Sequence, residues 1–130
     1  MWDGTFKPIE QVVVGDYVKS FDPNGNIVKG RVIRTFIHQN VHKYAKLKFV
    51  GRDAITHLTT EHRYWLPDLR FEAIANLSSS DKIRSFVDGE WADSVIESIE
   101  EVHEQVDVYN FHVDKRVYFA NGDAVHNSKA

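Results

Sequence analysis

Three consecutive residues near the C-terminus, His126, Asn127 and Ser128, have side chains that together can cut and rearrange a peptide backbone. The Asn127 side-chain amide can attack its own carbonyl carbon, a neighbouring imidazole can protonate the departing nitrogen, and a hydroxyl can carry an acyl group. The same tripeptide also favours turns, and terminal segments are often frayed and without function. Features elsewhere in the sequence are needed to choose between the catalytic interpretation and the structural one.

A second group of candidates is Thr-Thr-Glu-His at positions 59–62, which directly follows a predicted strand. From a tight turn, the Thr59 hydroxyl and the His62 imidazole can both point at one carbonyl group. The hydroxyl would stabilise an oxyanion there, and the imidazole would move a proton. Such a histidine can equally do no more than satisfy a loop carbonyl, so Thr59 and His62 are catalytic candidates that need support from elsewhere in the sequence.

The composition limits the class of protein. A length of 130 residues with 42% hydrophobic side chains predicts one domain with a buried core. Cysteine is absent, which excludes disulfides, cysteine-ligated zinc and thiol nucleophiles from this chain, and we expect no metal site. The net charge of −3 gives no reason to expect nucleic acid. We see no membrane span and no secretion leader, and we expect a cytoplasmic location.

Short alternating runs separated by turn signals dominate the chain and predict an all-β domain. Residues 22–26, Asp-Pro-Asn-Gly-Asn, form the clearest reversal, because proline presets one φ angle and Asn-Gly supplies positive φ. Residues 71–77 are the best helical candidate, whereas the β-branched residues in 94–102 favour a strand over a helix. The predicted extended segments are 12–14, 17–21, 27–37, 44–49, 55–59, 83–87, 90–91, 94–102, 106–113 and 116–120.

Acidic residues are concentrated between positions 88 and 107, where eight carboxylates occur without a lysine or arginine. A solvated strand face is the commoner explanation for such a run. The other explanation is an acidic edge that recruits a basic segment of a partner. The sequence leaves both open.

Several segments, taken in order, resemble an intein, a protein-splicing domain of the Hint fold. They include Asp-Gly, Lys-Pro-Ile-Glu and Gly-Asp within 3–22, the Thr-x-x-His pattern within 58–63, and the segments 108–113 and 119–128, the last ending in Val-His-Asn-Ser. The resemblance covers nearly the whole chain. It implies a compact, horseshoe-like domain of many short strands and hairpins, with at most one or two short helices.

The resemblance also implies a role for each candidate. Thr59 and His62 would strain and polarise the upstream scissile bond. Ser128 would accept the upstream segment as an ester, and Asn127 would cyclise to a succinimide with His126 as the proton donor. Each step exchanges one acyl bond for another, so the reaction is a single-turnover autocatalytic rearrangement that needs no cofactor.

Inteins begin with a nucleophilic Cys or Ser and a short strand, ahead of the stretch that starts here at Asp3. We therefore expect residues 1–127 to be the large C-terminal fragment of an early-split intein that lacks the first strand, and residues 128–130 to begin the downstream extein. The expected partners are a short N-terminal fragment carrying the first Cys or Ser and the flanking extein polypeptides, without nucleic acid or membrane. The alternatives are a Hint domain that cleaves without ligating, a truncated or inactivated contiguous intein, and a β-rich binding module with a coincidental tail.

Two positions depart from the family pattern. The family often has an aspartate where this chain has Asn110, and a histidine where it has Val117. That histidine often assists the cyclising asparagine. Its replacement leaves His126, helped by His112 or by water, to assist the reaction here.

Overall fold

The computed structural model describes residues 1–3, 7, 9–41 and 43–127, and strands make up most of this part of the chain. The all-β prediction is confirmed, and the two helices among the described residues are single 3-10 turns. The elements in chain order are η1 Ile9–Gln11, β1 Tyr17–Phe21, β2 Ile27–Val41, β3 Tyr44–Phe49, β4 Ile55–Leu58, β5 Arg63–Trp65, β6 Phe71–Ala73, η2 Ile74–Asn76, β7 Lys82–Val87, β8 Glu90–Val102, β9 Val106–Val113, β10 Val117–Ala120 and β11 Asp123–His126.

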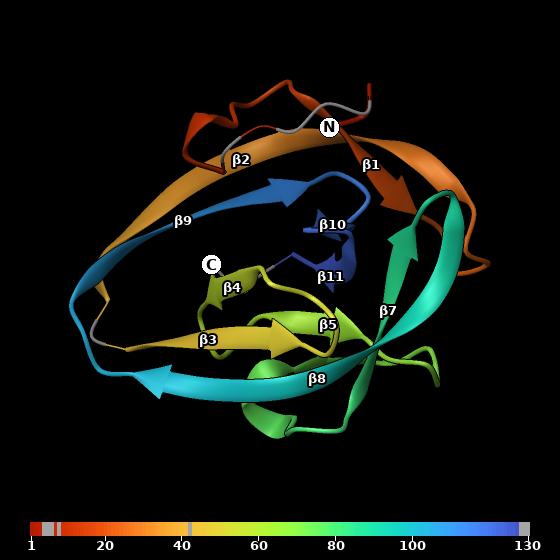
Figure 1. Ribbon diagram of the computed structural model, residues 1–130. Coiled ribbons are helices and arrows are strands. Elements are labelled where there is room, and N and C mark those ends of the chain that lie inside the picture. The colour runs from red at the N-terminus through yellow and green to blue at the C-terminus, as the bar shows by residue number, and fades with distance from the viewer. Residues whose placement is uncertain (4–6, 8, 42, 128–130) are drawn as a thin grey trace.

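The strands form two antiparallel sheets. The smaller sheet has the order β1-β2-β9, and the larger has the order β4-β3-β8-β7-β11-β5-β6, with β10 paired to β11. Figure 1 shows the long strands β2 and β9 running together along one side of the molecule and β3 and β8 along the opposite side, with β10 and β11 between them. The curved long strands give the domain a horseshoe-like outline, and the short strands near its centre carry the candidate residues.

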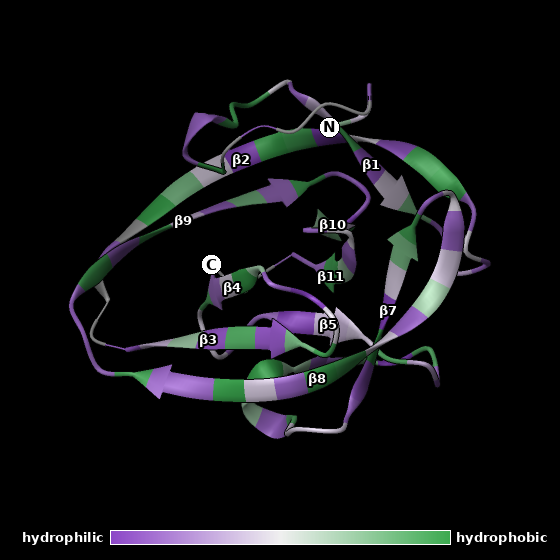
Figure 2. Cartoon of the chain, viewed as in Figure 1, coloured by the Kyte–Doolittle hydropathy of each residue, from purple (hydrophilic) through white to green (hydrophobic). Residues whose placement is uncertain are grey.

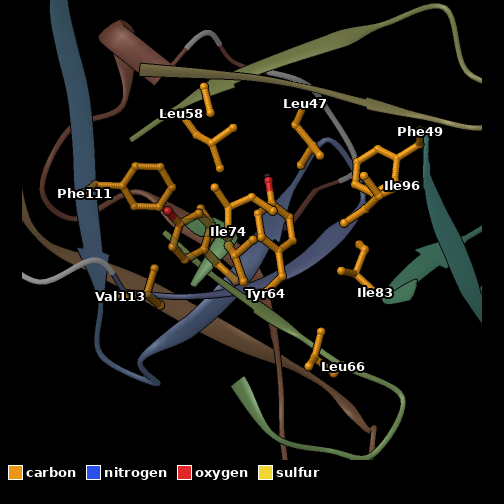
Figure 3. Packing of buried hydrophobic residues seen from close by; sticks show 14 of the residues in the cluster. Leu47, Phe49, Leu58, Tyr64, Leu66, Ile74, Ile83, Ile96, Phe111 and Val113 are labelled. Atoms are coloured by element: carbon orange, nitrogen blue, oxygen red, sulfur yellow. The ribbon is translucent and has the colours of Figure 1, made fainter. Parts of the chain in front are cut away.

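The core holds the central strands in place. Along the long strands, hydrophobic and hydrophilic residues succeed one another at short intervals, as expected for strands with one buried face (Figure 2). Side chains from several strands converge on Tyr64 and Ile74, each only 1% exposed (Figure 3). A second, aromatic cluster is built around Phe21 and Trp65, whose rings stack with centroids 4.8 Å apart.

A buried ion pair fixes the start of β11. The guanidinium of Arg52 donates to both carboxylate oxygens of Asp123, at 3.0 and 2.8 Å, and the Ser85 hydroxyl donates to the same carboxylate at 2.7 Å. Asp123 is fully buried. Because a buried carboxylate is stable only when it is paired and hydrogen-bonded, this network ties the strand that leads to His126 to the turn after β3.

Two predictions of secondary structure are wrong. The helix expected at 71–77 is instead β6 followed by η2, because β6 pairs with β5 and the helical geometry is limited to one 3-10 turn. The extended run expected at 12–14 is a loop, in which Val12 is buried and the Val13 amide donates to the Asp16 carboxylate. The short strands β5 and β11 were not predicted, since each is too short to show a period.

The acidic run lies mostly on β8, where one lysine of β3 and one that directly precedes β3 neutralise part of it. Lys48 lies 3.1 Å from Glu97, and Lys43 lies 3.1 Å from Glu101. β8 pairs first with β7 and then with β3, so the run belongs to a paired strand with a solvated face. In the described part of the chain, no helix has the length and apolar character needed to cross a membrane.

Candidate functional site

The pairing of β5 with β11 places Arg63 beside His126. In this antiparallel pair, Tyr64 is the partner of Val125, so the residues one step away, Arg63 and His126, face each other. Tyr64 and Val125 are both buried, whereas Arg63 and His126 are partly exposed. Since successive side chains on a strand point to opposite faces, the core residues direct Arg63 and His126 to a common face outside the core.

One guanidinium nitrogen connects the residues at this end of the site. Nη2 of Arg63 lies 2.8 Å from Nδ1 of His126 and 3.3 Å from the carbonyl oxygen of Asn127. Nδ1 of His126 is itself 3.0 Å from that oxygen. An arginine only donates hydrogen bonds, so its bond to Nδ1 requires the imidazole to accept there and to carry its proton on Nε2.

The side chain of Asn127 is held by the backbone of Val113 at the end of β9. The Val113 amide donates to Oδ1 of Asn127 at 3.0 Å, and Nδ2 of Asn127 donates to the Val113 carbonyl at 3.0 Å. The Asn127 backbone amide donates to the Arg116 carbonyl at 2.7 Å. Two hydrogen bonds thus fix the side-chain amide that is the candidate nucleophile, and a third fixes the backbone of the same residue.

Burial lowers the pKa of His126 below its ordinary value. The positive charges of Arg63 and Arg116, together with His112, lower it further, and the Asn127 carbonyl, which can accept a hydrogen bond from the protonated ring, acts in the opposite direction. The ring also packs edge-on against Phe71, with centroids 5.1 Å apart. His126 is therefore neutral at pH 7 and able to accept a proton or relay one.

Thr59 and His62 occupy one tight turn. The His62 backbone amide donates to the Thr59 carbonyl at 3.2 Å, which closes the turn between β4 and β5. The amides of Ala75 and Ile74 donate to the carbonyls of Thr60 and His62, at 3.0 and 2.9 Å. The turn is therefore fixed against η2 by backbone hydrogen bonds, and it directly follows the strand β4.

The His62 ring has a buried nitrogen without a partner. Its Nδ1 makes no hydrogen bond to any described residue. Burial, assisted by the charge of Arg63, lowers the pKa of His62 to about 4, so the ring is neutral at pH 7. An unsatisfied buried polar atom costs about 1–3 kcal/mol. Nδ1 of His62 therefore retains the capacity to form a hydrogen bond with a further group.

The predicted site residues thus fall into two groups. His126 and Asn127 lie together, Thr59 and His62 lie together, and β5 begins directly after His62. Ser128 lies outside the described residues. Arg63 was missed by the sequence analysis, although it follows the Thr-x-x-His pattern directly; its proximity to His126 depends on the pairing of two very short strands.

The two departures from the family pattern are both buried. The Asn110 side-chain oxygen accepts a hydrogen bond from the Phe111 amide at 3.0 Å. Val117 belongs to the aromatic cluster, although it is the strand partner of His126 in the β10–β11 pair. Of the helpers considered for His126, His112 is close enough to influence its pKa.

No family model and no curated protein matches the chain. The crystal structure of an Ssp DnaB mini-intein variant matches with a TM-score of 0.84 and 21% identity, over 98% of this chain and 87% of that one. A bacterial intein-like domain from Clostridium thermocellum gives 0.78 and 26% identity, over 92% and 86%. A DnaB intein from Synechocystis sp. gives 0.84 and 20%, over 97% and 89%.

These matches extend over almost the entire length of both partners, so they concern the whole architecture rather than one shared hairpin. At such low sequence identity they establish the backbone arrangement, in agreement with the resemblance seen in the motifs. The chain has the intein-type Hint fold.

Proposed function

We propose that this chain is a protein-splicing domain that releases itself by cyclising Asn127. The observation that carries the proposal is the arrangement of Asn127 itself, whose side-chain amide is fixed on Val113 while its carbonyl oxygen faces Arg63 and His126. The amide nitrogen is the nucleophile and the carbonyl carbon is its target. Both are held in one site, which is the main requirement for an intramolecular attack.

In the proposed step, Nδ2 of Asn127 forms a bond to its own carbonyl carbon, and the bond from that carbon to the nitrogen of Ser128 breaks. Nδ2 loses a proton and the departing nitrogen gains one, with His126 as the relay. The products are a C-terminal succinimide and a free amine on Ser128. Under this proposal residues 1–127 are intein, and residues 128–130 are the start of the downstream extein.

We propose that the upstream half of the reaction uses a short N-terminal fragment on a separate polypeptide. Its first Cys or Ser attacks the carbonyl that precedes it, which converts that peptide bond to a thioester or ester, and Ser128 then takes over the acyl group. The freed amine of Ser128 finally attacks the ester, which restores a peptide bond. Nδ1 of His62 makes no hydrogen bond to a described residue, and this supports the proposal because a scissile peptide beside the Thr59 turn would satisfy it.

The test is intact-mass analysis of the full chain mixed with a peptide that carries an upstream extein segment, a first Cys or Ser and an intein-type first strand. We expect a ligated product in which the upstream segment is joined to Ser128, together with a free intein. Asn127→Ala should abolish release of the intein. A mixture that forms no new covalent product, with wild type and Asn127→Ala alike, would contradict the proposal.

The same mixture separates splicing from cleavage without ligation. Ser128→Ala removes the acyl acceptor but leaves the Asn127 amide and carbonyl in place. If the chain splices, this variant loses the ligated product. If the downstream segment is the only product of the wild type, and Ser128→Ala releases it equally well, the chain is a Hint domain that cleaves without ligating.

A further inference from the structure

We infer that Arg63 is a further catalytic residue, which stabilises the negative charge that forms on the Asn127 carbonyl oxygen during cyclisation. This inference rests on the proposed function. It assigns a role to a residue that the sequence analysis did not single out. The structure supports it through position, charge and hydrogen-bond geometry.

Position is the first argument. Arg63 is held opposite His126 by the β5–β11 pair, with the buried Tyr64 and Val125 fixing the register. Its Nη2 reaches Nδ1 of His126 at 2.8 Å and the Asn127 carbonyl oxygen at 3.3 Å. The Arg63 Nε is buried and makes no hydrogen bond to a described residue, so the hydrogen bonds of this side chain are directed to the reacting end of the site.

Charge is the second argument. When Nδ2 of Asn127 attacks, the carbonyl oxygen becomes an alkoxide before the bond to Ser128 breaks. A guanidinium stays protonated throughout, so Arg63 neither gives nor takes a proton and acts only on the negative charge. Fixed donors that face a developing oxyanion commonly provide the largest single contribution to acyl-transfer catalysis.

The length of the hydrogen bond is the third argument. At 3.3 Å, the contact from Nη2 to the neutral carbonyl is longer than an optimal hydrogen bond. Charge-assisted hydrogen bonds to an oxyanion are shorter and stronger. The contact therefore gains strength as the alkoxide forms, and only such a gain between ground state and transition state increases the rate.

Arg63 also selects the tautomer of His126. By donating to Nδ1 it keeps the imidazole proton on Nε2, so a neutral His126 cannot donate from Nδ1 to the Asn127 oxygen. Arg63 then remains the donor to that oxygen. The other groups that influence His126 are Arg116, His112 and the ring of Phe71.

The experiment isolates the cyclisation step. The full chain, extended beyond Ala130 by a reporter peptide, is mixed with the N-terminal peptide whose first nucleophile is alanine, and release of the reporter is followed by mass from pH 5 to pH 9. We expect Arg63→Gln to slow release about 100-fold across the pH range, as loss of one oxyanion donor does. Arg63→Lys, which keeps the charge but not the planar guanidinium, should lie between Arg63→Gln and wild type.

Arg70→Gln is the matched control, because Arg70 is exposed and its ion-pair partners are Asp68 and Glu72. It should release the reporter at the wild-type rate. If Arg63→Gln shifted the pH at which the rate changes but reached the wild-type plateau, Arg63 would act only through His126 and the inference would be wrong. If Arg63→Gln fails to fold, the comparison of Arg63→Lys with wild type decides in the same way.

The design distinguishes failure of this inference from failure of the proposed function. If wild type releases the reporter and both Arg63 variants match its rate, only the role of Arg63 is wrong. If wild type releases nothing and behaves as Asn127→Ala does, the proposed function is wrong and this inference falls with it. Nitrogen NMR of His126 gives a second readout, in which the wild-type ring should carry its proton on Nε2 and Arg63→Gln should lose that preference.

Discussion

His62 and Arg63 are adjacent in sequence, yet their side chains lie in different halves of the candidate site and differ in their hydrogen-bond partners. Nη2 of Arg63 finds two acceptors at the Asn127 end, whereas Nδ1 of His62 is buried without a partner among the described residues. Under the proposed function, the chain's own strands supply the Asn127 nucleophile, its anchor and the groups that face its carbonyl oxygen. Around Thr59, they supply a rigid turn and an unsatisfied ring nitrogen. We therefore propose that this fold assembles the downstream half by itself and that the N-terminal fragment completes the upstream half.

The strongest test of the comparison is to remove His126. His126→Ala should slow cyclisation of Asn127 by about 1,000-fold, because loss of general acid–base catalysis costs about 100- to 10,000-fold. The upstream acyl shift should remain, so a branched ester on Ser128 should accumulate. Mass spectrometry and cleavage of the ester by hydroxylamine measure both quantities. Equal slowing of the acyl shift and of Asn127 cyclisation would show that the upstream and downstream halves of the site do not act separately.

Removal of His62 tests the upstream half of the site. His62→Ala should slow the upstream acyl shift by about 100-fold, as expected for loss of a positioned proton-transfer group. Release of a reporter downstream of Asn127, measured with the alanine-blocked peptide, should be affected much less. Loss of both steps to the same degree would instead indicate that His62 serves the whole site or the fold.

The pH dependence of stability gives a smaller effect. Burial lowers the pKa of His62 from its ordinary value of 6.5 to about 4 in the folded chain. Below pH 6.5 the unfolded chain binds a proton there and the folded chain does not, so stability present at pH 7 is lost as the pH falls to 4. The loss is about 3 kcal/mol.

Denaturant unfolding of wild type and His62→Gln at pH 7 and pH 4 measures that contribution, since the difference between the two proteins removes the effect of other titrating groups. The acid-induced loss should be smaller in His62→Gln by this amount. Binding of the N-terminal peptide should further change the pKa of His62, because the peptide supplies a partner for Nδ1. An unchanged His62 pKa on binding would contradict its place in the upstream half.

Substitution of Gly30 has the smallest expected effect. This residue lies against Val113, whose backbone holds the Asn127 side chain. A Cβ at this position would lie 2.6 Å from Cγ1 of Val113 and 3.1 Å from Cβ of Ser20. Gly30→Ala should therefore lower the free energy of unfolding by about 1–3 kcal/mol and slow cyclisation by disturbing Val113. Combining it with Val113→Ala makes room for the methyl group. The double variant should be more stable than the sum of the two single effects predicts, and simple additivity would show that the contact is not the cause.

The sequence was sufficient for those parts of the site that are neighbours along the chain. His126 follows Val125 and precedes Asn127, and Thr59 lies three residues before His62, so residue types made both groups candidates and the resemblance to inteins gave them roles, while the strand and turn pattern predicted the all-β class. Arg63 was not predicted because its position opposite His126 depends on β5 and β11, which are only three and four residues long. The anchoring of Asn127 is also invisible in the sequence, because Val113 contributes its backbone and not its side chain. The helix expected at 71–77 failed because pairing with β5 outweighed local helical preference.

The most direct test of the central claim is the chemical state of Asn127 after the full chain meets the N-terminal peptide. We expect the released intein to end in a succinimide at Asn127, detected as a mass one water lower than that of the hydrolysed form, and the downstream product to begin at Ser128. Asn127→Ala should give neither species. A released fragment that ends at another residue, or release that persists in Asn127→Ala, would contradict the account.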